Sequence, residues 1–143
     1  MIEVTVNWQQ PNEGNNSWLW GVSRGLYAYL NLNSGEEEEI LYIGKVDGTT
    51  VRRRWNRSGK QGFWDSLEQE RRIYSHGIIV GLIEIPAGRR VSRELITDIE
   101  SLLINRLCPW GNIQCRNSRI SRSGLIVKCE GDWPLNEYLY VDS

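Results

Sequence analysis

The feature that most restricts the fold is the segment GLYAYLNL at residues 25–32, in which aliphatic side chains alternate with two tyrosines. Successive side chains of a β-strand point to opposite faces of the sheet. The aliphatic residues of this segment therefore share one face, while Tyr27 and Tyr29 share the other. The pattern predicts a strand with an aliphatic face and a tyrosine face.

A second segment with the same pattern follows at residues 40–44, ILYIG. Leu41 and Ile43 are predicted to lie on one face of this strand, with Tyr42 and Gly44 on the opposite one. The acidic loop NSGEEEE joins the two segments. Together they predict a β-hairpin with a tyrosine-lined face.

The remaining segments mix further strands with helices, which predicts the α+β class. Strands are expected at IEVTV, GIIVGLIEIP, GLIVKCEG and EYLYV, and helices near 51–55, at roughly 63–75 and at 92–107. The chain has 143 residues and no internal repeat or low-complexity linker. It is therefore expected to form one domain.

The first helix is predicted to begin after Thr49 or Thr50, whose hydroxyl can satisfy a free amide of the first turn. Val51 and Trp55 lie four residues apart and predict the buried stripe of this helix. Arg54 lies beside that stripe, and the two arginines before it point further outward.

The helix at 92–107 has Ser92 as its expected N-cap and leucines and isoleucines at helical spacing. Glu100 falls on the margin of the apolar arc, where a carboxylate loses solvation. Glu94 and Asp98 are expected on the outer face as solvated acids.

The net charge of −1 conceals two clusters of basic residues. One contains Arg52, Arg53, Arg54, Arg57 and Lys60, and the other contains Arg116, Arg119, Arg122 and Lys128. The flat fork of arginine suits phosphate better than the point charge of lysine does. The clusters are compatible with nucleic-acid binding and equally with a solvated, mixed-charge surface.

The sequence contains no apolar run near the roughly 18 to 20 residues that span a bilayer, and its N-terminus lacks the layout of a secretion signal. A cytoplasmic protein without membrane association is expected. The three cysteines are spaced seven and fourteen residues apart, unlike paired zinc ligands. They are expected to be reduced thiols.

Taken in order, these motifs resemble the GIY-YIG nuclease family. The resemblance rests on GLY at 25–27, YIG at 42–44, Arg54 in VRRRW, Glu100 in the third helix and Asn112 in PWGN. Arg54 is chosen among its neighbours because the family pattern places the arginine three residues after one apolar position and directly before another. The resemblance extends from about residue 25 to residue 112.

The resemblance implies a small central antiparallel sheet of about three strands flanked by helices, to which this chain adds N- and C-terminal strands. Residues 1–143 would then be one nuclease domain, with a core at about 25–112 and a basic, strand-containing extension at 113–143. The hairpin between the tyrosines is longer than is usual in the family. A loop tip accommodates such an insertion at low cost.

The resemblance also implies a DNA endonuclease that hydrolyses phosphodiester bonds with one Mg²⁺ or Mn²⁺ ion. Glu100 would hold the ion, and Arg54 would stabilise charge that develops on the phosphate. Tyr27 would act as the general base or as an orienting group for the attacking water. Tyr42 would position the water or the phosphate, with help from Lys45.

Other residues are expected to support the site or to bind DNA. Gly25, Gly44 and Asn112 are predicted to be structural, with Asn112 tying down the loop after the third helix. Phosphate contacts are expected from Arg52, Arg53, Arg57, Lys60, Arg116, Arg119 and Arg122. Double-strand cutting by one active site would need a homodimer or a partner protein. Members of the family serve in repair, restriction and mobile-element homing, and restriction-like or mobile-element defence is the favoured role here.

Two alternatives stay beside the nuclease interpretation. The first is a catalytically inactive domain of the same fold that binds nucleic acid or regulates another protein. Ser58 favours it, because the family often carries a histidine or tyrosine at that position. The second is a protein-interaction domain whose contact surface is built from Trp8, Trp18, Trp20, Trp110 and Trp133.

Overall fold

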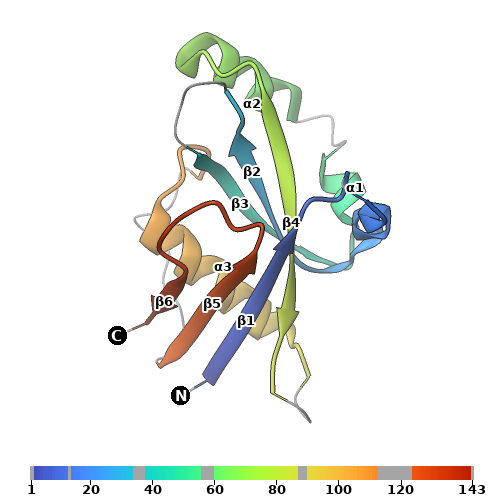
Figure 1. Ribbon diagram of the computed structural model, residues 1–143, viewed down its shortest axis with the longest axis vertical. Coiled ribbons are helices and arrows are strands. Elements are labelled where there is room, and N and C mark those ends of the chain that lie inside the picture. The colour runs from blue at the N-terminus through green and yellow to red at the C-terminus, as the bar shows by residue number, and fades with distance from the viewer. Residues whose placement is uncertain are drawn as a thin grey trace.

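The computed structural model describes residues 2–12, 14–33, 38–55, 60–86, 90–112 and 124–142. It confirms the α+β class: a six-stranded mixed sheet accompanied by a few helices (Figure 1). The strands are β1 (Ile2–Gln9), β2 (Arg24–Asn31), β3 (Glu39–Asp47), β4 (His76–Glu84), β5 (Leu125–Gly131) and β6 (Leu139–Val141). The helices are η1 (Asn16–Gly21), α1 (Val51–Trp55), α2 (Lys60–Ser66), η2 (Leu67–Arg71) and α3 (Arg93–Leu107).

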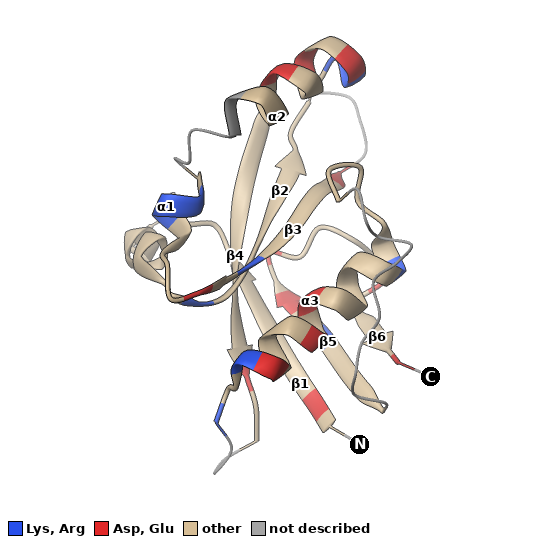
Figure 2. Cartoon of the chain, turned by 180° about the vertical axis from the view of Figure 1, so that it is seen from behind, with Lys and Arg blue, Asp and Glu red and all other residues tan. Residues whose placement is uncertain are grey.

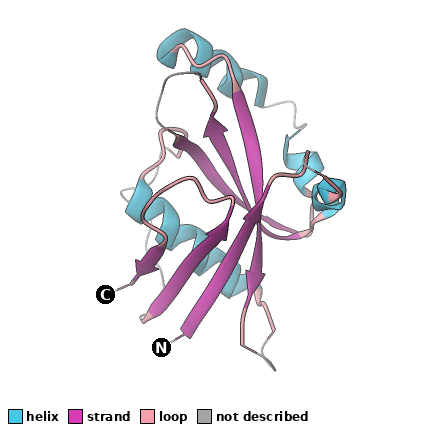
Figure 3. Ribbon diagram, viewed as in Figure 1, coloured by secondary structure: helices cyan, strands magenta, loops and turns pink. Residues whose placement is uncertain are grey.

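The strand order in the sheet is β3-β2-β4-β1-β5-β6. Neighbouring strands are antiparallel except β1 and β5, which run parallel. The predicted hairpin of β2 and β3 is present, and β4 pairs with the other side of β2. The N- and C-terminal strands extend this same sheet beyond β4 (Figure 3).

The two faces of the sheet are packed with different side chains. The α3 face is aliphatic, and its core includes Leu26, Ala28, Leu30, Ile79 and Val127 of the sheet with Leu95, Ile96, Ile99, Leu102 and Leu103 of α3. The aromatic face lies on the other side and contains Tyr27, Tyr29 and Tyr42 with Trp20, Trp55, Phe63, Trp64 and Trp110. The predicted separation of aliphatic and tyrosine side chains in β2 is therefore confirmed.

The prediction for Leu41 is wrong. A β-bulge shifts the register of β2 and β3, so that Tyr29 is opposite Tyr42 while Leu30 is opposite Ile40. Leu41 is the extra residue, and it packs in the aromatic-face core while Ile43 packs on the α3 face. An inserted residue breaks the two-residue period, which the alternation pattern alone did not reveal.

The helix starts agree with the predicted caps. The Thr50 hydroxyl accepts a hydrogen bond from the Arg53 amide at 3.2 Å, and the Ser92 hydroxyl accepts one from the Leu95 amide at 3.1 Å. The helical segment expected at 63–75 begins earlier and ends earlier, at Arg71. Arg72 terminates it by adopting the left-handed conformation, with φ of 55°.

The prediction that Asp98 is a solvated acid is also wrong, since only 4% of this residue is exposed. Asp98 and Glu100 flank Ile99, so each lies about 100° from it around the helix, in opposite directions. The buried arc of α3 is wide enough to include the Asp98 side. Glu94 is exposed, as expected.

The expectation of three reduced cysteines is correct for Cys129, a buried free thiol, and wrong for Cys108, which is disulfide-bonded. Cys115 lies outside the described residues. Across the described ranges, none of the helices combines the length and the apolar character that crossing a bilayer requires.

Candidate active site

Three tyrosines form a compact cluster on the aromatic face, at the centre of the hairpin. The ring centroids of Tyr27 and Tyr29 are 5.4 Å apart, those of Tyr27 and Tyr42 are 6.0 Å apart, and those of Tyr29 and Tyr42 are 5.4 Å apart. Tyr27 and Tyr29 are buried, while Tyr42 is half-buried. Tyr27 and Tyr42 are predicted site residues, whereas Tyr29 has no predicted role.

Gly44 provides the space that the Tyr27 ring occupies. The two residues are directly opposite each other in the β2–β3 pair. A Cβ at position 44 would lie 2.4 Å from both Cζ and Oη of Tyr27. Because β3 is the outermost strand, a ring that crosses Gly44 brings its hydroxyl to the open edge of the sheet.

Gly25 has a different reason to lack a side chain. A Cβ there would lie 2.7 Å from the carbonyl oxygen of Gly81 on the neighbouring strand β4. This glycine therefore permits close approach of two backbones at the start of β2, next to the tyrosine cluster.

Glu100 reaches the same edge of β3 from α3. Its carboxylate accepts a hydrogen bond from the backbone amide of Lys45. The Lys45 ammonium donates to the hydroxyl of Thr97 at 2.8 Å, and that hydroxyl donates to the Arg93 carbonyl at 3.0 Å. Glu100 is thus held at the edge of the sheet, beside Lys45.

Arg54 of α1 interacts electrostatically with Glu100 of α3 and with Tyr27 of β2. Burial raises the pKa of the Glu100 carboxyl, and the charges of Lys45 and Arg54 oppose this rise. The Arg54 charge also acts on the Tyr27 hydroxyl. Its Nε atom is buried and has no hydrogen-bond partner among the described residues. Residues far apart in the sequence therefore meet at the edge of β3, around a cation with an unused donor.

The protonation of Tyr27 argues against a role as general base. Burial raises its pKa above the ordinary value, and the neighbouring Tyr42 and Tyr29 raise it further. Arg54 lowers the pKa, but this effect is smaller. The hydroxyl therefore keeps its proton at neutral pH and is suited to donating a hydrogen bond.

Asn112 completes the edge of β3. Its side-chain oxygen accepts from the Ile43 amide at 3.0 Å, and its side-chain nitrogen donates to the Ile43 carbonyl at 2.9 Å. The Gly111 amide donates to the Leu41 carbonyl at 2.7 Å. The segment after α3 thus supplies hydrogen-bond partners to the outer backbone groups of Leu41 and Ile43. Glu100 does the same for the next outer amide, that of Lys45.

Arg52 and Arg53 are exposed on α1, which appears in blue in Figure 2. The Arg52 guanidinium lies over the ring of Trp20, 5.4 Å from its centroid. The other predicted phosphate contacts, Arg57, Arg116, Arg119 and Arg122, lie outside the described residues, as do Ser58 and the side chain of Lys60.

The tryptophans pack mostly within the protein. Trp8 is fully buried and contacts the ring of Trp133, with centroids 5.1 Å apart. Trp20 and Trp110 pack against the aromatic face, and Trp18 is exposed over 57% of its surface. The five tryptophans of the protein-interaction alternative are therefore divided between the two faces of the sheet, and most of them pack against the core, where large rings bury apolar surface.

Two further groups were missed by the sequence analysis. Thr97 lies one turn after Arg93 and one turn before Glu100, so helical spacing indicated its position. Asp47 binds both Arg24 and Arg93. That cluster joins β2, β3 and α3, and no local sequence pattern connects these segments.

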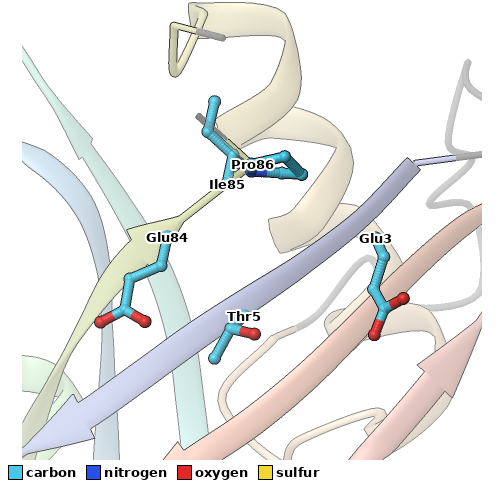
Figure 4. A pocket seen from close by; sticks show the side chains of 5 residues that line it. All are labelled: Glu3, Thr5, Glu84, Ile85 and Pro86. Carbon is cyan, nitrogen blue, oxygen red and sulfur yellow. The ribbon is translucent and has the colours of Figure 1, made fainter. Parts of the chain in front are cut away.

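A pocket of about 300 Å³ lies elsewhere, where β1 begins and β4 ends (Figure 4). It is lined by Glu3, Thr5, Glu84, Ile85 and Pro86. None of the predicted site residues lines it. The two glutamates flank Thr5 and make the pocket unfavourable for a phosphate.

The described residues include no group of three or more His, Cys, Asp and Glu side chains that could hold a metal ion. Beside Lys45 of β3, Glu100 supplies a carboxylate, which is a hard oxygen donor. Lys45 and Arg54 are the cations near this carboxylate, and the buried Nε of Arg54 has no hydrogen-bond partner among the described residues. These residues fit a hard divalent cation that takes its other ligands from water and a phosphate.

Compared with protein-family models, with curated proteins and with solved structures, the chain matches none of them.

Proposed function

We propose that this protein is a divalent-metal-dependent DNA endonuclease of the GIY-YIG kind. The observation that carries the proposal is the meeting of Tyr27, Arg54 and Glu100 at one edge of β3, where Arg54 acts on both of the other groups. In this proposal, β3, β2 and β4 with α1 and α3 form the family core at about 25–112, and the last strands belong to the extension.

Glu100 is the residue that would hold Mg²⁺ or Mn²⁺. A bound divalent ion would neutralise charge on the phosphate and on the departing 3′-oxygen. The Lys45 amide fixes one side of the carboxylate and so determines which lone pairs remain for a ligand. Because burial already disfavours the charged carboxylate, a cation beside it would gain an interaction that water does not screen well.

Arg54 would bind the nonbridging oxygens of the phosphate. Its buried Nε has no hydrogen-bond partner within the described ranges, which is costly unless a ligand provides one. Packing of Val51 and Trp55 against the aromatic face holds α1 in place. The guanidinium is therefore positioned before substrate arrives, which is how a donor stabilises charge developing in a transition state.

Tyr27 would donate a hydrogen bond and orient the attacking water or the phosphate. Its ring lies in the space above Gly44 and against Tyr29 and Tyr42, so its hydroxyl has little freedom. Tyr42 is the more exposed member of the pair and would position the water from the solvent side.

The test is nicking of supercoiled plasmid DNA with Mg²⁺ or Mn²⁺, compared with the same reaction in chelator. We expect cleavage that requires the metal and is lost in Glu100→Gln. Glu94→Gln is the matched control, because it makes the same change on an exposed position of the same helix. Tyr27→Phe should reduce cleavage strongly while leaving the fold intact. Equal activity of Glu100→Gln and Glu94→Gln would contradict the proposal.

The raised pKa of Tyr27 favours the alternative of an inactive domain that binds nucleic acid. In that case the wild-type protein binds DNA with the same affinity as Glu100→Gln, and neither protein nicks plasmid with any divalent metal. The plasmid assay, paired with a binding measurement, separates the two functions.

A further inference from the structure

We propose that Arg24 and Arg93, joined by Asp47, form a second phosphate-binding site for the DNA that enters the candidate active site. This inference rests on the proposed function and adds to it a contact outside the residues that the sequence analysis selected. The cluster lies where the start of β2, the end of β3 and the first turn of α3 come together.

The geometry presents two guanidinium groups on one carboxylate. Arg24 Nε lies 3.4 Å from one oxygen of Asp47, and Arg93 Nε lies 2.7 Å from the other. The Arg24 and Arg93 side chains are 52% and 75% exposed, whereas that of Asp47 is only 13% exposed. The carboxylate therefore lies beneath two cations that face solvent.

The cluster keeps an excess of positive charge and unused donors. Two arginines against one aspartate leave one net positive charge. Arg24 also donates from Nη1 to the Val91 carbonyl at 3.1 Å. Arg93 contacts Asp47 through Nε, and its two terminal nitrogens have no hydrogen-bond partner in the part of the chain that the structure describes. A guanidinium with free terminal nitrogens matches the geometry of a phosphate.

Asp47 fixes the arginines. The hydrogen bond from Arg93 is the main cause that lowers the pKa of Asp47, and Arg24 contributes in the same direction. The carboxylate therefore stays ionised at neutral pH and limits the rotamers of both long side chains. This ordering reduces the entropy that each arginine would lose on binding a ligand.

The cluster lies on the same stripe of α3 as the candidate active site. Arg93, Thr97 and Glu100 follow one another at spacings of four and three residues, and all three contact β3 or its side chains. Seven residues of helix rise about 10 Å. Successive phosphates of one strand advance about 3.4 Å along the B-DNA axis. A phosphate bound at Arg93 would therefore lie a few nucleotides from the one at Glu100.

The site also has arginines on two elements that flank it. Arg52 and Arg53 lie on α1, which is drawn blue in Figure 2, and Arg93 lies in the first turn of α3, which is drawn blue and red because Glu94 follows it. DNA that contacts both flanks would pass over the edge of β3. The second flank supplies a basic contact within the described residues that does not depend on the C-terminal basic cluster.

The test is binding of a fluorescently labelled DNA duplex in chelator, measured by anisotropy over a range of salt concentrations. We expect Arg93→Gln and Arg24→Gln each to weaken binding several-fold and to reduce the magnitude of the salt slope by about one. Arg106→Gln is the matched control: it removes the same charge from the far end of α3. Thermal unfolding of each variant verifies that the fold is intact.

Three outcomes are decisive. A decrease of the salt slope by about one in Arg93→Gln and in Arg24→Gln, but not in Arg106→Gln, supports the inference. Equal slopes for these variants, Arg106→Gln and the wild type would overturn it while leaving the nuclease proposal standing, provided that the wild type still binds and cuts DNA. A wild-type protein that neither binds nor cuts DNA would overturn both.

Discussion

The two faces of the sheet differ around the same strand, β2. On the α3 face, Leu26, Ala28 and Leu30 pack against a regular 15-residue helix. On the aromatic face, Tyr27 and Tyr29 pack beneath short helices that carry tryptophan, phenylalanine and arginine. The side chains that β2 buries on the α3 face are aliphatic. Those that it buries on the aromatic face are rings that carry hydroxyl groups.

This difference separates stability from positioning. Aliphatic side chains gain free energy from removal of apolar surface from water and place no polar group. Tyrosine rings contribute similar burial and also hold a hydroxyl at a defined point. Side chains of the two faces come together at the edge of β3, where Glu100 from one side and Arg54 from the other reach the residues around Gly44. The candidate site occupies that edge.

The largest effect on stability is expected on the α3 face. Leu103 is fully buried, so Leu103→Ala should reduce the free energy of unfolding by about 2–5 kcal/mol. Denaturant unfolding measures this change. At a temperature where the variant is folded, its nicking activity should match that of the wild type. A selective loss of nicking in a fully folded variant would show that the two faces are not separable in this way.

A substitution on the aromatic face is expected to change the nicking rate much more than the free energy of unfolding. Arg54→Gln is expected to reduce the nicking rate roughly 100- to 1000-fold, because it removes a fixed donor to the phosphate. Unfolding free energy should change little, since the buried Nε makes no hydrogen bond within the described residues. Arg53→Gln, on the exposed side of the same helix, is the matched control. It should raise KM and leave kcat near the wild-type value.

A third substitution tests the space that lets the aromatic face reach the edge. Gly44→Ala places a methyl group 2.4 Å from the Tyr27 ring, so the ring must shift. We expect a loss of about 1–3 kcal/mol in unfolding free energy, together with slower nicking. Gly62→Ala is the control: it meets no atom within 4 Å and lies in α2, where alanine should stabilise by roughly 0.5–1 kcal/mol.

The smallest expected effect is a change in the pH dependence of stability, which the charge of Glu100 causes. Burial raises the pKa of its carboxyl in the folded protein, so the folded state binds this proton more tightly than the unfolded chain does. This group therefore reduces stability as pH rises from its unfolded pKa through its folded pKa. Glu100→Gln should remove that pH dependence and be more stable than the wild type at neutral pH, as measured by Tm from pH 4 to pH 8.

The same pair of proteins tests the metal without an activity assay. Mg²⁺ at ten times its dissociation constant would stabilise the wild type by about 1.4 kcal/mol. It should leave the Tm of Glu100→Gln unchanged. An equal increase of Tm in both proteins would place the metal elsewhere.

Several parts of this arrangement followed from the local sequence. The tyrosine alternation of β2, the caps Thr50 and Ser92, and the outward direction of Arg52 and Arg53 depend on interactions within one or two turns of chain. The bulge at Leu41 did not follow, because an inserted residue is specified by pairing with another strand. The burial of Asp98 likewise depends on what covers α3 from outside the helix.

The sequence alone determined the strand periodicity, the helix starts and the identity of the residues that bear charge, since neighbouring residues decide these properties. The tertiary structure decided that β3 would be the edge strand, that Gly44 would lie beneath Tyr27, and that Asp47 would join two distant arginines. These features need segments tens of residues apart to meet. Burial and hydrogen bonding across the whole domain select that meeting, and no short stretch of sequence contains it.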